Sequence, residues 1–408
     1  MRVLMISPRL PYPPSTGARL RTFHLLKGLA TRHDVTLLAI FDDPAKAHSV
    51  TPLKQYCGDV VTVFVPTSSR PLTAHVGGLL SATPYYRAVV QSAAFQDRVF
   101  ALMRDKRYDA VHVEHLGMAH FAARLSGVRK LLNMPDVESI YFRRLAMHMR
   151  PGINRLLTSL DAVKLPSYMR KVIHRFDRCL ATSDADADEI RRLVPSANVV
   201  VIPNGVDPLE FSPRPDEEQP ARIVFTGTLS YFPNADAMVF FCRNVFPIVR
   251  RAVPDLRLTI VGQEPPPEVT ALEGVQGVEV TGRVPDVRPY LAAAAVAVVP
   301  LRLGSGTRLK ILEAMAMAKA VVSTSLGAEG LDVTPGHDIE IADTPAAFAE
   351  RLIALCRDPA RRGRLGAHAR HTISEKYAWP TISARLESVY QELIEDRRPS
   401  LAERAPGA

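Results

Sequence analysis

The chain has 408 residues, of which 47% are hydrophobic and 23% are charged, and its formal net charge at pH 7 is +9. This composition is that of a globular protein, and no stretch reaches the roughly 20 uncharged apolar residues of a membrane-spanning helix. The length exceeds one ordinary core, so we expect two α/β domains of roughly 200 residues each.

The N-terminus and the cysteines indicate a cytoplasmic protein. The apolar start of the chain ends within a strand length at a series of prolines, so it lacks the apolar core of a secretion signal. The four cysteines lie far apart without a CxxC pair, which favours reduced thiols over a disulfide framework or a zinc site.

In the first half of the chain, short apolar runs alternate with helical patterns. Near-continuous apolar runs are typical of parallel strands that are covered on both faces. The expected strands are 2–7, 35–41, 60–65, 110–113, 130–133, 179–182 and 199–202, and the expected helices include 18–30 and 88–106.

A proline-containing acidic segment, 208–220, reads as a linker, and the βα pattern then restarts. We expect a second doubly wound sheet, and Asp286 is expected to cap a short helix. The strands predicted here are 222–226, 256–261, 278–280, 295–299, 320–324 and 339–341, and the helices include 235–252, 286–291 and those after Pro345. The polar tail after Arg397 is expected to be disordered.

The stretch from Gly304 to Met317 follows an apolar strand and combines a Gly-rich turn with a helix. Bare glycine backbone allows a ligand to approach closely, and the helix N-terminus favours an anion. Arg308 and Lys310 place two cations at the positive end of the helix dipole, a cost that a bound anion would explain. Glu313 lies among apolar residues, and its carboxylate suits ribose hydroxyls. The pattern thus predicts a nucleotide site; the alternative is a helix with surface cations and a half-exposed glutamate.

The positive charge is concentrated between Arg143 and Arg178, where nine basic and two acidic residues give a net +7. Apolar residues are interleaved with the cations, which suits an anionic membrane surface or an anionic lipid-linked substrate. No nucleic-acid-binding motif accompanies the charge, so we expect no nucleic acid partner. The alternative is a solvated basic helix face. The four residues proposed to contact acceptor or membrane are Arg143, Arg144, Arg170 and Lys171.

Polar and glycine residues follow the ends of many predicted strands. Ligands of open α/β sheets bind at the carboxyl ends of the strands, so two such sheets joined by a linker predict a ligand cleft. The groups at these ends are Gly17, Glu114, His115, Asp136, Asn204, Gly205, Gly227, Thr228, Gly262, Gly282, Arg283 and the residues from Gly304 to Lys310.

Several of these stretches together resemble a known family. They are the N-terminal Pro-x-x-x-Gly-x-x-Leu-Arg-Thr motif and the segments 203–207, 222–234, 281–285 and 304–318. The sequence resembles a retaining glycosyltransferase of the GT-B fold, group 1 or family 4, and looks most like bacterial sugar transferases of exopolysaccharide and capsule gene clusters.

The resemblance implies an α/β fold with two Rossmann-like domains facing each other across a cleft. The implied domains are an N-terminal acceptor domain (1–207), the linker, a nucleotide-sugar domain (221–375), a helix that returns to the first domain (376–396) and a flexible tail (397–408). The implied donor is a nucleotide-diphosphate sugar, UDP or GDP, and the implied acceptor is lipid-linked or a polysaccharide. The reaction is expected to proceed by front-face displacement without a metal or cofactor.

The resemblance also assigns roles to residues. Glu313 matches the glutamate that bonds the ribose, and Gly282, Arg283 and Val284 match the segment that meets the base. His115, or Glu114 beside it, lies where the family often carries a histidine aimed at the donor sugar; the alternative for His115 is a satisfied strand-end histidine. The expected donor-binding residues are Gly17, Gly227, Thr228, Asn234, Gly262, Gly282, Arg283, Val284, Gly304, Ser305, Gly306, Thr307 and Glu313.

The chain departs from the family pattern at two places. Ser305 stands where the family has the first glutamate of its Glu-x7-Glu motif. Thr228 and, loosely, Asn234 stand where the family has a diphosphate-binding arginine and lysine. Arg308 and Lys310 are expected to compensate and to stabilise the leaving diphosphate.

Three other functions fit parts of the pattern. They are a GT-B nucleotide-sugar epimerase, a Rossmann oxidoreductase, and a catalytically silent GT-B binding protein. The oxidoreductase is disfavoured because no Gly-x-Gly-x-x-Gly follows the first strand. The sequence does not indicate an oligomeric state.

Overall fold

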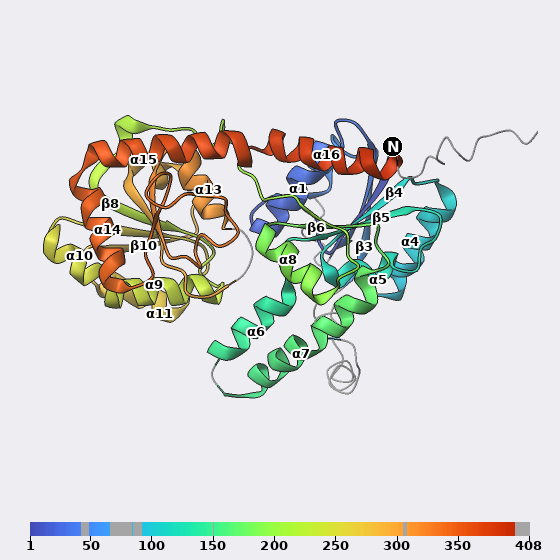
Figure 1. Cartoon of the computed structure of the whole chain (residues 1–408), viewed down its shortest axis with the longest axis horizontal. Coiled ribbons are helices and arrows are strands. Elements are labelled where there is room, and N and C mark those ends of the chain that lie inside the picture. Colours follow the sequence, from blue (N-terminus) through green and yellow to red (C-terminus); the bar gives the residue numbers. More distant parts are fainter. Residues whose placement is uncertain (42–48, 66–83, 85–91, 150, 305–307, 396–408) are drawn as a thin grey trace, which may run out of the picture. The chain divides into compact units, whose positions relative to one another are not determined.

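The chain folds into two compact units, each built on its own sheet (Figure 1). The computed structural model describes residues 1–41, 49–65, 84, 92–149, 151–304 and 308–395. Unit 1 contains residues 1–203 together with the chain from Ile382 onward, and unit 2 contains residues 204–381.

Unit 1 is built on a seven-stranded parallel sheet in the order β3-β2-β1-β4-β5-β6-β7, which confirms the expected doubly wound fold. Nearly all side chains of the central strands are buried, because helices cover both faces. The strands are β1 (Arg2–Ser7), β2 (Asp34–Phe41), β3 (Asp59–Phe64), β4 (Ala110–Glu114), β5 (Arg129–Met134), β6 (Arg178–Ala181) and β7 (Val199–Val201). The α-helices are α1 (Gly17–Leu29), α4 (Ala93–Asp105), α5 (Ala119–Ala122), α6 (Glu138–His148), α7 (Ile153–Ile173) and α8 (Asp184–Leu193).

Unit 2 repeats this architecture with six parallel strands in the order β10-β9-β8-β11-β12-β13. The strands are β8 (Gln219–Thr226), β9 (Arg257–Val261), β10 (Val278–Gly282), β11 (Ala294–Val299), β12 (Ala320–Ser323) and β13 (Glu340–Ile341). The α-helices are α9 (Phe232–Asn244), α10 (Phe246–Ala252), α11 (Pro267–Thr270), α12 (Arg288–Ala293), α13 (Leu309–Ala316), α14 (Pro345–Arg357) and α15 (Pro359–Thr372), and α16 (Trp379–Glu395) leads back into unit 1.

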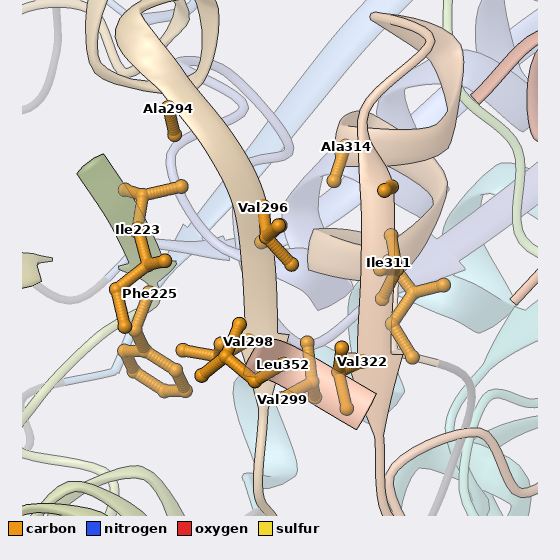
Figure 2. Close-up of a cluster of buried hydrophobic side chains, with 14 of the residues drawn as sticks. Ile223, Phe225, Ala294, Val296, Val298, Val299, Ile311, Ala314, Val322 and Leu352 are labelled. Carbon is orange, nitrogen blue, oxygen red and sulfur yellow. The ribbon is translucent and has the colours of Figure 1, made fainter. Parts of the chain in front are cut away.

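Strand β11 and helix α13, which flank Gly304, are anchored in the core of unit 2. Figure 2 shows Val296 and Val298 of β11 between Ile223 of β8 and Val322 of β12, with Ile311 of α13 packed beside them. All five side chains are buried. Because β11 and α13 are both fixed by apolar packing, the loop between them is held at both ends.

The strand order changes direction at one point in each sheet. In unit 1 this point lies between β1 and β4, and in unit 2 it lies between β8 and β11. Loops that leave the two strands at such a point diverge to opposite faces, which is where open α/β sheets bind ligands. The loops after β1, β4, β8 and β11 carry most of the predicted site residues.

Two helical predictions are corrected by the structure. The single helix expected over 235–252 is divided at Val245 into α9 and α10, because Pro247 in the first turn of α10 has no N–H to continue the hydrogen-bond ladder. The short helix predicted from Asp286 begins two residues later, at Arg288, and Asp286 accepts a hydrogen bond from the Arg288 N–H at 2.9 Å. The start of the helix expected over 88–106 lies outside the described residues.

The segment predicted as a linker is held against unit 2 by cationic side chains. Arg370 donates a hydrogen bond to the carbonyl of Pro208 at 3.2 Å. Glu218 accepts from Lys319 and Arg362, each at 3.0 Å, and both of these side chains are buried. Breaking a buried ion pair by removing one partner costs about 3–5 kcal/mol, so this segment is fixed to unit 2.

The last helix, α16, docks on unit 1 through close contacts. A Cβ added to Gly28 of α1 would lie 2.4 Å from the hydroxyl of Ser383, so glycine permits the approach of the two helices. Farther along α16, Glu387 bonds His33 at 2.8 Å, and the fully buried Tyr390 bonds His112 of β4 at 2.8 Å. The helix therefore completes the core of unit 1.

Candidate functional site

Three loops of unit 2 are joined by backbone hydrogen bonds at the carboxyl edge of the sheet. The N–H of Gly227 donates to the carbonyl of Val261 at 3.0 Å, and the N–H of Gly262 donates to the carbonyl of Gly282 at 3.2 Å. The loops after β8, β9 and β10 consequently lie side by side, and three of the predicted donor-binding glycines are brought together.

Two of these glycines have no room for a side chain. A Cβ on Gly262 would lie 1.8 Å from the carbonyl oxygen of Gly227. A Cβ on Gly227 would lie 2.7 Å from the Lys310 ammonium and 2.9 Å from Asn234 Nδ2, and the φ of Gly227 is 153°. The close approach of these loops therefore requires glycine at both positions.

Lys310 reaches from α13 across to the loop that follows β8. Its ammonium donates a hydrogen bond to Asn234 Oδ1 at 2.7 Å and lies 3.8 Å from the centroid of the Phe225 ring. Asn234 in turn donates to the carbonyl of Thr228 at 2.7 Å. Burial and the nearby charge of Arg308 hold the pKa of Lys310 well below its usual value. The sequence predicted these residues as separate contacts, and the structure brings Lys310 and Asn234 together.

Arg308 is the N-cap residue of α13, and its side chain is buried. The guanidinium folds back over Gly304, whose φ is 116°; a Cβ there would lie 2.9 Å from Arg308 Nη2. The cation thus lies at the end of β11, beside the helix N-terminus, as the sequence predicts. Ser305, Gly306 and Thr307, also predicted to bind donor, lie outside the described residues.

Glu313 is half-buried on α13, one turn after Lys310. Burial raises the pKa of the Glu313 carboxyl to about 7, although the charge of Lys310 lowers it; the charge of Glu210 raises it further. Such a carboxyl gains from hydrogen-bond donors that replace lost water, and a pair of hydroxyls would supply them.

The segment expected to meet the base follows β10 directly. Gly282 has a φ of 67° and open space where a Cβ would stand. Val284 packs partly against the core, whereas Arg283 is exposed. The backbone of this turn is therefore accessible at the edge of the sheet, next to the loops of Gly227 and Gly262.

In unit 1 the candidate groups lie at the neighbouring ends of β1 and β4. Gly17 begins α1, and its backbone is exposed. His115 follows β4 with a φ of 69°, an unusual conformation for a side chain larger than glycine. Burial lowers the pKa of His115, with further lowering by the charges of Arg9 and Arg21 and opposition from Glu114.

Glu114, by contrast, faces the interior of unit 1 and is fully buried. One carboxylate oxygen is bonded to His112 at 3.0 Å, and the other accepts from Thr22 at 3.0 Å and from Asn133 at 2.8 Å. Burial alone would raise the pKa of Glu114, but the hydrogen bonds and charge of its neighbours lower it to about 2. This placement favours a supporting role, and contact between Glu114 and a donor stays a prediction.

Arg21 was not predicted as a site residue, although it belongs to the N-terminal motif. Its guanidinium is buried in unit 1 and donates to Asn133 Oδ1 at 2.9 Å and to the carbonyl of Pro203 at 2.9 Å. Burial lowers its pKa to about 10. The sequence does contain a sign of this role, because Arg21 lies on the same face of α1 as Leu25. A charged residue on a buried helix face needs a partner inside the protein.

Comparison with protein families accounts for both units. Residues 15–209 match the model described as Glycosyltransferase Family 4, and residues 220–358 match the model described as Glycosyl transferases group 1. The chain belongs to the group 1 glycosyltransferase families, of GT-B type.

Relatives of this glycosyltransferase extend over nearly its whole length. An uncharacterized 44.6 kDa protein in the cps region of Klebsiella pneumoniae is 22% identical, over 92% of this chain and 96% of the relative. Sucrose-phosphate synthase from Thermosynechococcus elongatus has a similar fold, with a TM-score of 0.72, 17% identity and coverage of 97% and 100% of the two chains. Anabaena HepE, solved in complex with UDP-glucose, has a TM-score of 0.67, 16% identity and coverage of 96% and 100%.

The basic segment of the glycosyltransferase forms a helical hairpin of α6 and α7, which extends away from the sheet of unit 1 (Figure 1). Arg143 and Arg144 lie in the middle of α6. Arg170 and Lys171 lie in the last turn of α7, about 26 Å along the helix axis from Ile153. The structure therefore separates the four residues into two pairs, and the second pair also complements the dipole of α7.

The hairpin turn carries exposed apolar side chains. Met147, Ile153 and Leu156 are 61%, 63% and 53% exposed. Among the described residues, no helix of the glycosyltransferase is long and apolar enough to span a bilayer.

Proposed function

We propose that this glycosyltransferase moves a sugar from a nucleotide-diphosphate sugar, UDP- or GDP-linked, to a lipid-linked or polysaccharide acceptor with retained anomeric configuration. The proposal rests on the carboxyl edge of the sheet in unit 2. There the loops of Gly227 and Gly262 lie together, and the Lys310 side chain reaches Gly227. Lys310 lies in the first turn of α13, the helix that also carries Glu313. Backbone N–H groups, cations and a carboxyl acceptor for hydroxyls match diphosphate and ribose in one ligand.

Each group is assigned one task in this proposal. Arg308, Lys310 and the N-terminus of α13 bind the diphosphate and stabilise the negative charge that develops as it leaves. Glu313 accepts hydrogen bonds from the ribose, and the turn at Gly282 meets the base. His115 bonds the donor sugar. A diphosphate beside Lys310 favours the charged ammonium, so donor binding and protonation of Lys310 are linked.

The proposed reaction is a front-face displacement. The bond between the anomeric carbon and the phosphate oxygen breaks, and the acceptor oxygen bonds to the same face of that carbon. The acceptor proton passes to the leaving phosphate oxygen. In this proposed reaction no protein nucleophile and no metal takes part.

A role in cell-surface polysaccharide synthesis is supported by the relative from a cps region. A lipid-linked acceptor is supported by the hairpin turn, where exposed apolar side chains lie near Arg143 and Arg155. Apolar groups enter the interfacial region of a bilayer while cations pair with anionic headgroups, so we propose that this turn binds the inner face of the cytoplasmic membrane.

The donor proposal is tested by turnover with a panel of UDP-, GDP-, ADP- and dTDP-sugars, with and without EDTA, in which released nucleotide diphosphate is measured. We expect slow release from one donor, insensitive to EDTA and lost in Arg308→Met. Arg302→Met is the matched control, because Arg302 is an exposed cation on the same loop, bound to Asp236. Sensitivity to EDTA would contradict the metal-independent reaction, and donor binding without turnover in the presence of lipid extract would favour a silent binding protein.

The membrane proposal is tested by flotation with vesicles containing phosphatidylglycerol. Ile153→Ser with Leu156→Ser is expected to reduce bound protein several-fold, because two inserted side chains are lost. Leu209→Ser is the control, since Leu209 is 86% exposed but belongs to unit 2. Equal binding of all variants would contradict the assignment of the hairpin turn.

A further inference from the structure

A chain of buried polar groups links α16 to the end of β4. Tyr390 bonds His112 Nδ1 at 2.8 Å, and His112 Nε2 bonds Glu114 at 3.0 Å. All three side chains are fully buried. The donor and acceptor contacts proposed above use neither Tyr390 nor His112, so the chain of bonds needs another explanation.

The two ends of this chain hold the His112 ring. Hydrogen bonds keep Glu114 ionised, with its pKa near 2, so its carboxylate only accepts. His112 Nε2 therefore carries a proton and donates it to Glu114. Burial raises the pKa of Tyr390 well above its usual value, so the phenol remains protonated, and its oxygen lies 2.8 Å from His112 Nδ1. The His112 ring is thereby held between Tyr390 and Glu114, with one ring nitrogen bonded to each.

The same network reaches the backbone of His115. The side chain of Asn133 donates to Glu114 at 2.8 Å and accepts from Arg21 of α1 at 2.9 Å, while the Asn133 carbonyl accepts the N–H of His115 at 2.9 Å. The positive φ of His115 is unfavourable for a residue with a Cβ and persists only where its surroundings hold it. Asn133 provides that hold, and its own side chain is fixed by Glu114 and Arg21.

We propose that Tyr390 and His112 are positioning residues, which act through Glu114 and Asn133 to fix the His115 imidazole for its contact with the donor sugar. The inference rests on the proposed role of His115. It assigns the final helix a part in the reaction beyond its packing on unit 1. The same network reaches α1, because Thr22 donates to Glu114 and Arg21 donates to Asn133. Both residues lie about one turn after Gly17, so these hydrogen bonds also fix the start of α1.

The test is Tyr390→Phe, which removes one hydroxyl and leaves the ring. Tyr108→Phe is the matched control, because Tyr108 is also buried in unit 1 and its hydroxyl has no hydrogen-bond partner among the described residues. We expect kcat to fall at least about tenfold in Tyr390→Phe, with KM for the nucleotide sugar unchanged, because the donor is held by unit 2. The control variant should match the wild type.

A second readout does not depend on turnover. The imidazole signals of His115, followed by NMR across pH, report its surroundings, which include Glu114, Arg9 and Arg21. We expect their position and titration to change in Tyr390→Phe and to stay constant in Tyr108→Phe. Unchanged His115 signals would overturn the inference even if the enzyme is active. Changed signals in a protein without donor turnover would support the positioning of His115 while contradicting the proposed function.

If Tyr390→Phe unfolds, Thr22→Val provides the same test from the other end, since it removes only the hydroxyl that donates to Glu114 at 3.0 Å. A shift of the His115 signals is again expected. Their constancy in a folded Thr22→Val protein would overturn the inference.

Discussion

At the scale of single residues, the candidate donor site combines groups that destabilise the empty protein. The Lys310 amine is held next to the Arg308 guanidinium, which lowers its pKa, and Glu313 is a carboxyl partly removed from water. A loss of folding stability of this kind is typical of binding sites, where the ligand restores the missing interactions. The loss can be measured as a change in the free energy of unfolding.

Glu313→Gln is expected to stabilise the empty protein at pH 8 and to weaken donor binding. Because the pKa of Glu313 is about 7 in the folded protein and lower when unfolded, the folded state holds more protons between these values. The free energy of unfolding therefore falls as pH rises toward 7. The full shift corresponds to about 3 kcal/mol, and solvent screening of the half-buried Glu313 reduces this loss to about 1–2 kcal/mol. The amide removes the loss at pH 8 and changes nothing near pH 4. Chemical denaturation at both pH values measures the difference.

Glu210→Gln is the control, because Glu210 is an exposed acid near Glu313 that has no proposed contact with the ribose. It should leave donor affinity unchanged. Equal stability of Glu313→Gln and wild type at pH 8 would contradict the raised pKa.

Gly262→Ala is expected to destabilise unit 2 by about 1–3 kcal/mol and to abolish donor binding, because the new Cβ would meet the carbonyl oxygen of Gly227 at 1.8 Å. Gly274→Ala serves as the comparison, since a Cβ there has open space. Thermal unfolding followed with and without donor gives both quantities. Retained affinity in Gly262→Ala would show that the adjacent loops do not form the donor site.

At the scale of elements, the sequence predicted nearly every strand, because near-continuous apolar runs between turn residues have few other structural solutions. It missed the break at Val245, where Pro247 is compatible with either one kinked helix or two. The sequence correctly placed Glu114 at a strand end. It did not predict that the carboxylate faces the interior, because that direction depends on Thr22 and Asn133. Such contacts join residues far apart in the chain, and no local pattern encodes them.

The docking of α16 on α1 gives a prediction at this scale. Gly28→Ala is expected to lower the free energy of unfolding by about 1–3 kcal/mol, because the added methyl group would lie 2.8 Å from Ser383 Cβ as well as 2.4 Å from its hydroxyl. Ser383→Gly removes both atoms and should restore part of that loss in the double variant. Denaturant unfolding of the four proteins gives the coupling energy. Additive effects would contradict direct contact between the helices.

At the scale of the whole molecule, unit 2 is one continuous segment whose ends are paired. The N–H of Val206 donates to the carbonyl of Tyr377 at 2.9 Å, and the N–H of Trp379 donates to the carbonyl of Val206 at 3.2 Å. Unit 1, in contrast, is made from two separate parts of the chain, since the fully buried Tyr390 of α16 belongs to it.

A fragment of residues 204–381 is therefore expected to fold alone and to bind donor, whereas residues 1–203 alone are expected to lack a cooperative transition. Trp379, the single tryptophan of the sequence, is buried in unit 2 against Gly205, so its fluorescence reports the unfolding of the fragment. Addition of a peptide with the sequence of residues 382–395 should restore cooperative unfolding to residues 1–203. A non-cooperative 204–381 fragment would contradict this division.

The paired ends of unit 2 also bear on how such a gene is recombined. Codons 204–381 form one uninterrupted cassette, and the two junctions of that cassette are neighbours in the folded protein. Exchange of the whole cassette for that of a relative would transplant the candidate donor site in one event and would keep Tyr390 with His112. A single crossover between codons 203 and 382 would instead join the first part of unit 1 to a foreign final helix, and the bond to His112 would then depend on the new partner.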